Sequence, residues 1–255
     1  MFDGIVDMVY CMTLIGSERS ETIHRKIKRS RLATTVTIQY NHGYKCDGKG
    51  LKQRVSFNDI THAVANIFRH AAEKGYENIL VLEDDFIVDT LYVKQHDIDR
   101  VGEFTKSNTF DLYNLGGSSW VSYPVGLHHR RAIYSGIAHA IIYNKSYFDK
   151  YIRHVEGLKY DIHCDSVQNE IPDCLVYMYY KPLLFQLFHR TENRATSWGK
   201  DQDLLDAVFA SMELDKDHVN YQLFFGMILW WFEITLISLI ITVMVWKTSI
   251  KNKCT

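Results

Sequence analysis

Three consecutive carboxylates, Glu83, Asp84 and Asp85, follow directly after the apolar residues 79–82. Such side chains repel one another and are costly to bury, so a strand rarely ends in three of them without a cation to hold. Carboxylate oxygens suit Mg²⁺ or Mn²⁺, and these ions keep coordination sites for water and for substrate phosphates. The motif therefore predicts a divalent cation that binds a nucleotide or phosphate ester. The alternative is a solvated acidic turn.

An amphipathic helix precedes the acids. Apolar residues recur at spacings of three and four over residues 60–72, which makes one face of a helix. Ser56 or Asn58 is suited to cap its start, and Gly75 is suited to end it. A short connection then leads to the strand at 79–82. Because open α/β sheets bind ligands at the carboxyl ends of their strands, we expect the acids at a ligand-binding edge.

Strand and helix patterns alternate through the rest of the chain. The patterns predict strands at residues 9–14, 34–40, 110–115 and 137–143, and helices at residues 18–31 and 146–155. This alternation is typical of a largely parallel sheet that helices cover on both faces. With only three prolines and no visible linker or repeat, residues 1–218 are interpreted as one domain.

The composition is that of a folded protein that does not bind nucleic acid. The chain has 255 residues, of which 47% are hydrophobic and 23% charged, which suffices for one full core. A formal net charge of −1 gives no positive field for a polyanion, and the basic run at residues 25–31 has no interleaved aromatic side chains. The five cysteines show no zinc-type spacing and predict mostly free thiols.

Residues 224–246 form an apolar segment with the length of a membrane-spanning helix. Glu233 is its only charged residue, and a short basic tail at residues 247–255 follows; a buried core helix is the alternative. We expect a single-pass, C-terminally anchored membrane protein, with endoplasmic reticulum or Golgi membranes considered. The lack of a signal peptide favours a cytosolic domain, whereas the lysines after the segment favour a cytosolic tail, so both orientations stay open.

The order of these motifs resembles glycosyltransferase family 25, which includes lipopolysaccharide and collagen galactosyltransferases. The resemblance rests on Thr61-His62, residues 79–86, 111–116 and 138–142, the aspartates Asp161 and Asp165, and residues 182–186. No single motif is specific, but their order over residues 9–197 is. The first strand departs from the family pattern, because residues 13–16 lack the family's asparagine.

What the resemblance implies is a GT-A fold, which is the Rossmann-like fold of nucleotide-diphospho-sugar transferases. It also implies a metal-dependent hexosyltransferase with Mn²⁺ or Mg²⁺ and a nucleotide-sugar donor, of which UDP-hexose is favoured. The acceptor would be a hydroxyl of a glycan, glycolipid or protein. Members are expected to invert the sugar carbon, which requires a carboxylate base on the acceptor hydroxyl.

The same resemblance assigns roles to individual residues of this chain. The expected metal ligands are Asp85 and Asp84, and we add His189 as a third. The expected donor contacts are Glu83, Asp84, His139 and Gln186. The expected base is Asp165, with Asp161 as the second choice.

Other interpretations of these features stay open. His139 in an apolar strand is more often a core histidine than a catalytic one. Residues 120–134, rich in aromatic side chains, are interpreted as an acceptor-binding loop or as a segment that packs against the core or the membrane. The main alternative function is a membrane-anchored, catalytically inactive protein that keeps the fold. A phosphorelay receiver domain is disfavoured because a helix and many residues precede the acids.

Overall fold

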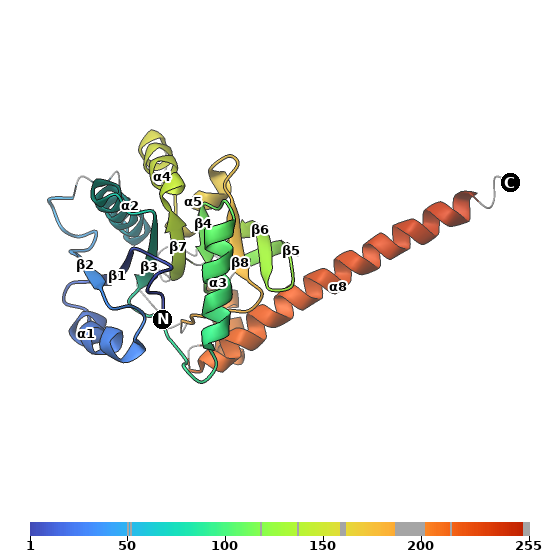
Figure 1. The fold of residues 1–255 in the computed structure, drawn as a ribbon, viewed down its shortest axis with the longest axis horizontal. Coiled ribbons are helices and arrows are strands. Elements are labelled where there is room, and N and C mark those ends of the chain that lie inside the picture. Colours follow the sequence, from blue (N-terminus) through green and yellow to red (C-terminus); the bar gives the residue numbers. More distant parts are fainter. Residues whose placement is uncertain are drawn as a thin grey trace.

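One eight-stranded sheet organises the chain (Figure 1). The computed structural model describes residues 1–49, 51, 53–117, 119–136, 138–158, 162–186, 202–214 and 216–251. The strands are β1 (Met8–Leu14), β2 (Val36–Asn41), β3 (Asn78–Glu83), β4 (Leu112–Asn114), β5 (Ser119–Pro124), β6 (His129–Ser135), β7 (Ala140–Asn144) and β8 (Val176–Tyr179). The helices are α1 (Glu18–Ser30), α2 (Ser56–Lys74), α3 (Gln95–Ser107), α4 (Lys145–Gly157), α5 (Cys164–Glu170), α7 (Gln202–Ser211) and α8 (His218–Lys251).

The sheet is mixed, with the strand order β2-β1-β3-β7-β4-β8-β6-β5. β1 pairs in parallel with β2 and β3, and β4 pairs in parallel with β8. β7 and β6 are antiparallel to both of their neighbours. The α/β class is therefore as predicted, but the expectation of a largely parallel sheet missed two reversed strands. Antiparallel neighbours need no crossover helix, and the alternation of elements along a sequence does not give strand direction.

Helices cover both faces of the sheet because the strands at its centre are apolar on both sides. On one face, Leu80 and Leu82 of β3 belong to a core that also contains residues of α1 and α3. On the other face, Ile79 and Val81 belong to a core with residues of α2, α4 and α5. Successive residues of β3 therefore point to different helices, as the two-residue period of a strand requires.

The predicted helix of residues 60–72 is α2. It starts at Ser56, after the extended N-cap Val55, which makes no side-chain cap hydrogen bond. Gly75 ends the helix in the left-handed conformation, with a φ of 71°, and this confirms its predicted role. Residues 120–134, interpreted above as a loop, lie within the β5–β6 hairpin.

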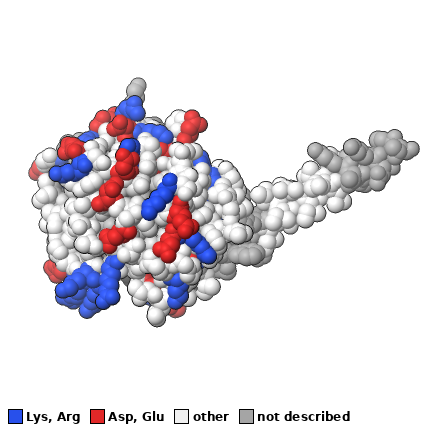
Figure 2. Space-filling model, viewed as in Figure 1, with Lys and Arg blue, Asp and Glu red and all other residues white. Residues whose placement is uncertain are grey.

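The basic run forms much of the outer face of α1. Figure 2 shows lysine and arginine gathered on the side of the molecule where α1 lies in Figure 1. Arg25, Lys28, Arg29 and Arg31 are exposed. The buried side of the helix is anchored by Ile23. This amphipathic division agrees with a solvated helix face.

α8 begins within the domain and extends well beyond it (Figure 1). Tyr221 and Phe225 are buried in a third core cluster, together with Phe185, Phe209 and Leu214. The Tyr221 hydroxyl donates a hydrogen bond of 3.0 Å to the carbonyl of Gly116. Although the composition placed the end of the domain at residue 218, the first two turns of α8 contribute to its core. From residue 234 to residue 246 the side chains of α8 are exposed.

None of the helices in the described part of the chain combines the length and the apolar composition needed to cross a membrane. The span predicted at residues 224–246 is therefore not confirmed.

We predict that Phe225 stabilises the globular domain. Phe225→Ala should lower the free energy of unfolding by about 3–5 kcal/mol, because the aromatic ring is 1% exposed and its removal leaves a cavity. Leu223→Ala, on the same helix but 57% exposed, should change it by less than about 0.5 kcal/mol. Urea unfolding of the full chain, followed by far-UV circular dichroism, measures both. Equal effects of the two substitutions would contradict the assignment of this turn to the core.

Candidate active site

The carboxyl ends of β1 and β3 meet at one edge of the sheet and bring the acids to α1. These strands pair in parallel with Met12 opposite Glu83. Thr13 is the next residue of β1, and its hydroxyl donates to Oδ2 of Asp84 at 2.7 Å. Ser17 then caps α1 through its side chain, so the first turn of this helix begins beside the acids.

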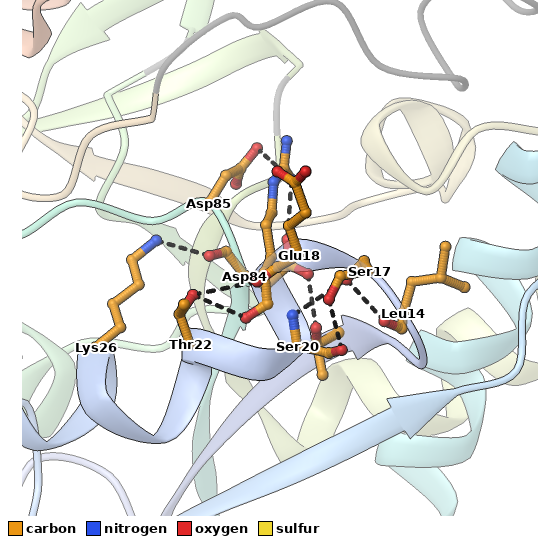
Figure 3. A network of polar contacts seen from close by, with 10 residues as sticks. Leu14, Ser17, Glu18, Ser20, Thr22, Lys26, Asp84 and Asp85 are labelled. Atoms are coloured by element: carbon orange, nitrogen blue, oxygen red, sulfur yellow. Dashed lines mark hydrogen bonds and ion pairs between the residues drawn. The ribbon is translucent and has the colours of Figure 1, made fainter.

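Asp84 has partners on both of its carboxylate oxygens. Besides Thr13 on Oδ2, the Nη1 of Arg19 donates to Oδ1 at 2.9 Å. The Nζ of Lys26 donates to the backbone carbonyl of Asp84 at 2.6 Å, and Figure 3 shows this lysine reaching the residue from farther along α1. The Asp84 side chain is 11% exposed. These contacts tie Asp84 to both β1 and α1.

Asp85 differs because one of its oxygens lacks a partner. Its Oδ2 accepts from Nη1 of Arg19 at 3.4 Å. Its Oδ1 is buried and has no hydrogen bond within the described residues. Burial raises the pKa of Asp85, and the charge of Arg19 opposes that rise. Because a buried acceptor without a donor is costly, this oxygen is suited to receive a cation.

Glu83 lies on the other side of the same strand end, next to α5. One ligand atom each from Glu83, Cys164 and Asp165 lie within 4.8 Å of one another. Burial and the nearby charges of Asp85 and Asp165 hold the pKa of Glu83 well above its ordinary value. Residues that are far apart in the sequence therefore form one acidic cluster at the edge predicted to bind ligand.

Backbone contacts hold Asp165 and the end of β3 in place. The Oδ1 of Asp165 accepts from the backbone N–H of Ala138 at 3.1 Å and from the Cys164 thiol at 3.5 Å. The backbone N–H of Glu83 donates to the carbonyl of His139 at 3.0 Å. The segment that leads into β7 therefore joins α5 to β3. Burial raises the pKa of Asp165.

The donor atoms of the cluster fit a hard divalent cation. Burial holds the pKa of the Cys164 thiol well above its ordinary value, and a protonated thiol is a poor metal ligand. The remaining donors are carboxylate oxygens, which are the ligands that Mg²⁺ and Mn²⁺ prefer. Glu83 and the unpartnered oxygen of Asp85 are the donors suited to such an ion, and Asp165 lies beside Glu83. The predicted set of Asp85, Asp84 and His189 stays a prediction, although Asp84 is already bonded within the protein.

His139 is fully buried behind the cluster. Its Nε2 lies 3.0 Å from the carbonyl of Leu184, which can only accept, so Nε2 carries a proton. Burial lowers the pKa of His139 to about 4, which keeps the ring neutral. The ring lies so close to Gly116 that a Cβ at that position would be 2.2 Å from Cε1. The observed contacts are those of a core residue, and contact with a nucleotide stays a prediction.

The other predicted residues fall near the site or outside the described chain. Gln186 is buried and follows Phe185, whose backbone exchanges hydrogen bonds with Ile87, close to the acids. Asp161 and His189 lie outside the described residues. Sequence reasoning assigned no role to Arg19 or Cys164. The only sequence signal for Arg19 is its place at the start of a basic helix that follows the first strand. For Cys164 the sequence offers no signal, because it belongs to no metal-binding or catalytic motif.

No protein-family model matches the chain, and no curated protein matches its sequence. The chain is similar to the solved structure of a glycosyltransferase involved in the glycosylation of the major capsid of PBCV-1. That match has 9% identity, covers 78% of this chain and 99% of the other, and has a TM-score of 0.41. The chain is also similar to the nucleoside-diphosphate-sugar pyrophosphorylase from Vibrio cholerae. Here the identity is 11%, the coverage 67% and 71%, and the TM-score 0.37. At these scores neither likeness decides the fold family or the reaction.

We predict that the neighbouring acids Asp84 and Asp85 have different effects on stability. Asp84→Asn should lower the free energy of unfolding by about 1–3 kcal/mol, because an amide nitrogen would replace an oxygen that accepts from Thr13 or Arg19. Asp85→Asn should be neutral or stabilising in the absence of metal, because it removes a repulsive charge. Urea unfolding of the EDTA-treated full chain tests both substitutions. If Asp85→Asn lowers the free energy of unfolding as much as Asp84→Asn does, then Asp85 stabilises the fold as much as Asp84 and the distinction between them is wrong.

Proposed function

We propose that the protein is a metal-dependent hexosyltransferase, which moves a sugar from a nucleotide-sugar donor to a hydroxyl group. The observation that carries this proposal is the meeting of Glu83 and Asp165, which are far apart in the sequence, at the carboxyl-end edge of an α/β sheet, directly beside Asp84 and Asp85. The buried, unpartnered oxygen of Asp85 supports it. Mg²⁺ and Mn²⁺ in such sites are commonly shared between a few carboxylates and substrate phosphates, which makes a nucleoside diphosphate the expected ligand.

The acids have separate roles under this proposal. Asp85 and Glu83 would hold the cation, which when bound would neutralise charge on the leaving diphosphate. Asp84 keeps β1 and α1 in position through Thr13 and Arg19. This division follows the observed hydrogen bonds, in which Asp84 has both oxygens occupied and Asp85 does not.

Asp165 is the proposed general base. It would take the proton of the acceptor hydroxyl as the acceptor oxygen bonds to the anomeric carbon. The bond from that carbon to the diphosphate oxygen breaks, and its electron pair leaves with the nucleoside diphosphate. A single displacement of this kind inverts the sugar carbon. Burial raises the pKa of Asp165, which makes its carboxylate a stronger base.

A binding protein without catalysis is the second candidate. It is favoured by Arg19, whose Nη1 contacts both Asp84 and Asp85 and so supplies a positive charge from the protein itself. Hydrolysis of a nucleotide sugar by the full chain, measured with and without Mn²⁺, separates this candidate from an enzyme. Metal-dependent binding without any turnover would favour the binding protein.

We predict that Asp85→Ala abolishes Mn²⁺-dependent binding of a nucleoside diphosphate, because the ion would lose its carboxylate and the diphosphate its bridging charge. Isothermal titration of the full chain with UDP, GDP and ADP, each with and without Mn²⁺, measures this. Asp99→Ala, an exposed acid on α3, is the matched control and should bind like the unaltered chain. Unchanged metal-dependent binding by Asp85→Ala would reject the metal assignment.

We predict that Asp165→Asn lowers turnover by about 10²-fold or more while donor affinity is nearly kept, because a base acts on the acceptor in the transition state. Asp173→Asn, at an exposed position farther along the chain, should leave turnover unchanged. Steady-state kinetics with a nucleotide sugar and Mn²⁺ give both values. If donor and Mn²⁺ affinity fall with turnover, Asp165 is a metal ligand and Asp161 becomes the candidate base. If neither changes, the residue is structural.

A further inference from the structure

Arg19 lies at the same edge of the sheet as the acids. β1 ends at Leu14, and a turn containing Gly16, with a φ of 77°, leads directly into α1. The backbone N–H of Ser20 donates to the Ser17 hydroxyl at 3.1 Å, which fixes the first turn. Arg19 is therefore placed by a short, capped connection from the strand that pairs with β3.

The guanidinium of Arg19 is only partly used by the protein. Nη1 makes both contacts to the acids, at 2.9 Å to Asp84 and 3.4 Å to Asp85. The described residues offer no acceptor to its Nε or Nη2. The side chain is 36% exposed, so a ligand can reach it from solvent. A guanidinium presents five N–H donors in a planar fork, and this one has several to spare.

A cation on Asp85 would change the balance of these contacts. Arg19 and a divalent ion are both positive, so their repulsion would weaken the longer contact, the one to Asp85. The shorter contact, from Nη1 to Oδ1 of Asp84, does not involve Asp85 and would be kept. Arg19 would then remain tethered at the edge of the site, with its open N–H groups near the position of the ion and its phosphates.

We propose that Arg19 binds the diphosphate of the donor after a cation displaces it from Asp85. The planar fork of arginine matches the geometry of phosphate oxygens, and bidentate arginine–phosphate contacts are among the strongest hydrogen bonds in proteins. This inference rests on the proposed function, because it requires a diphosphate in the site.

Lys26 is less suited to this role. Its Nζ donates to the Asp84 carbonyl at 2.6 Å and lies 4.6 Å from the centre of the Phe86 ring. Both contacts hold the acidic turn against α1. Arg25, by contrast, is exposed on the basic face of the same helix and provides a matched control.

The test compares two titrations of the full chain, one with Mn²⁺ alone and one with a nucleoside diphosphate at saturating Mn²⁺. Arg19→Gln should bind Mn²⁺ as tightly as the unaltered chain or several-fold more tightly, because a competing charge is gone. It should bind the nucleoside diphosphate about 10- to 100-fold more weakly, the loss expected for a hydrogen bond to a charged group. Arg25→Gln should change neither affinity.

Two other outcomes would overturn the inference. If Arg19→Gln weakens the binding of Mn²⁺ and of the nucleoside diphosphate equally, the residue only maintains the site. If the affinity for the nucleoside diphosphate is unchanged, Arg19 does not contact phosphate. Either result overturns the inference but leaves the proposed function intact. If the unaltered chain binds no nucleoside diphosphate with Mn²⁺, the proposed function fails and the inference fails with it.

A thermal melting curve shows whether Arg19→Gln is folded. If it is not, the same two titrations are made with Arg19→Lys. Lysine keeps the charge but not the fork, so only nucleotide affinity should fall.

Discussion

The parallel pairing of β1 with β3 is the contact on which the site depends. Its register places Met12 opposite Glu83, so Thr13 lies where its hydroxyl can bond Asp84. α1 follows β1 after a short turn, and the same register therefore brings Arg19 to the acids. A shift of β3 by one residue would turn every side chain to the opposite face and would move Glu83 away from Asp165.

An excess of negative charge is the second constraint. Glu83, Asp84, Asp85 and Asp165 meet at one edge, and in the described part of the chain Arg19 alone forms ion pairs with them. The protein therefore neutralises only part of the charge that it gathers. Burial makes the remaining charge costly, since it raises the pKa of Glu83, Asp85 and Asp165. A divalent cation bound there would offset this cost.

Sequence periodicity predicted the elements around the site better than it predicted the site's contacts. The helix α2 was found because its apolar face repeats over several turns and because Gly75 gives a left-handed end. The hairpin at residues 120–134 was missed because its alternation is interrupted; the strands themselves pair with register shifts. No local pattern shows that Asp165 meets Glu83, since that contact is made between segments far apart in the chain.

The different roles of the three acids follow from the geometry of a strand. In β3 the side chains of Ile79 and Val81 point to the face of α5, and those of Leu80 and Leu82 point to the face of α1. Continued past the end of the strand, this alternation sends Glu83 to α5 and Asp84 to α1. Consecutive carboxylates thus point to different faces of the sheet, each with its own neighbours. Asp85, beyond the strand, keeps one oxygen without a partner. A shift of the motif by one residue along β3 would exchange the structural and the ligand-binding acids, so the position of the motif in the strand matters as much as its composition.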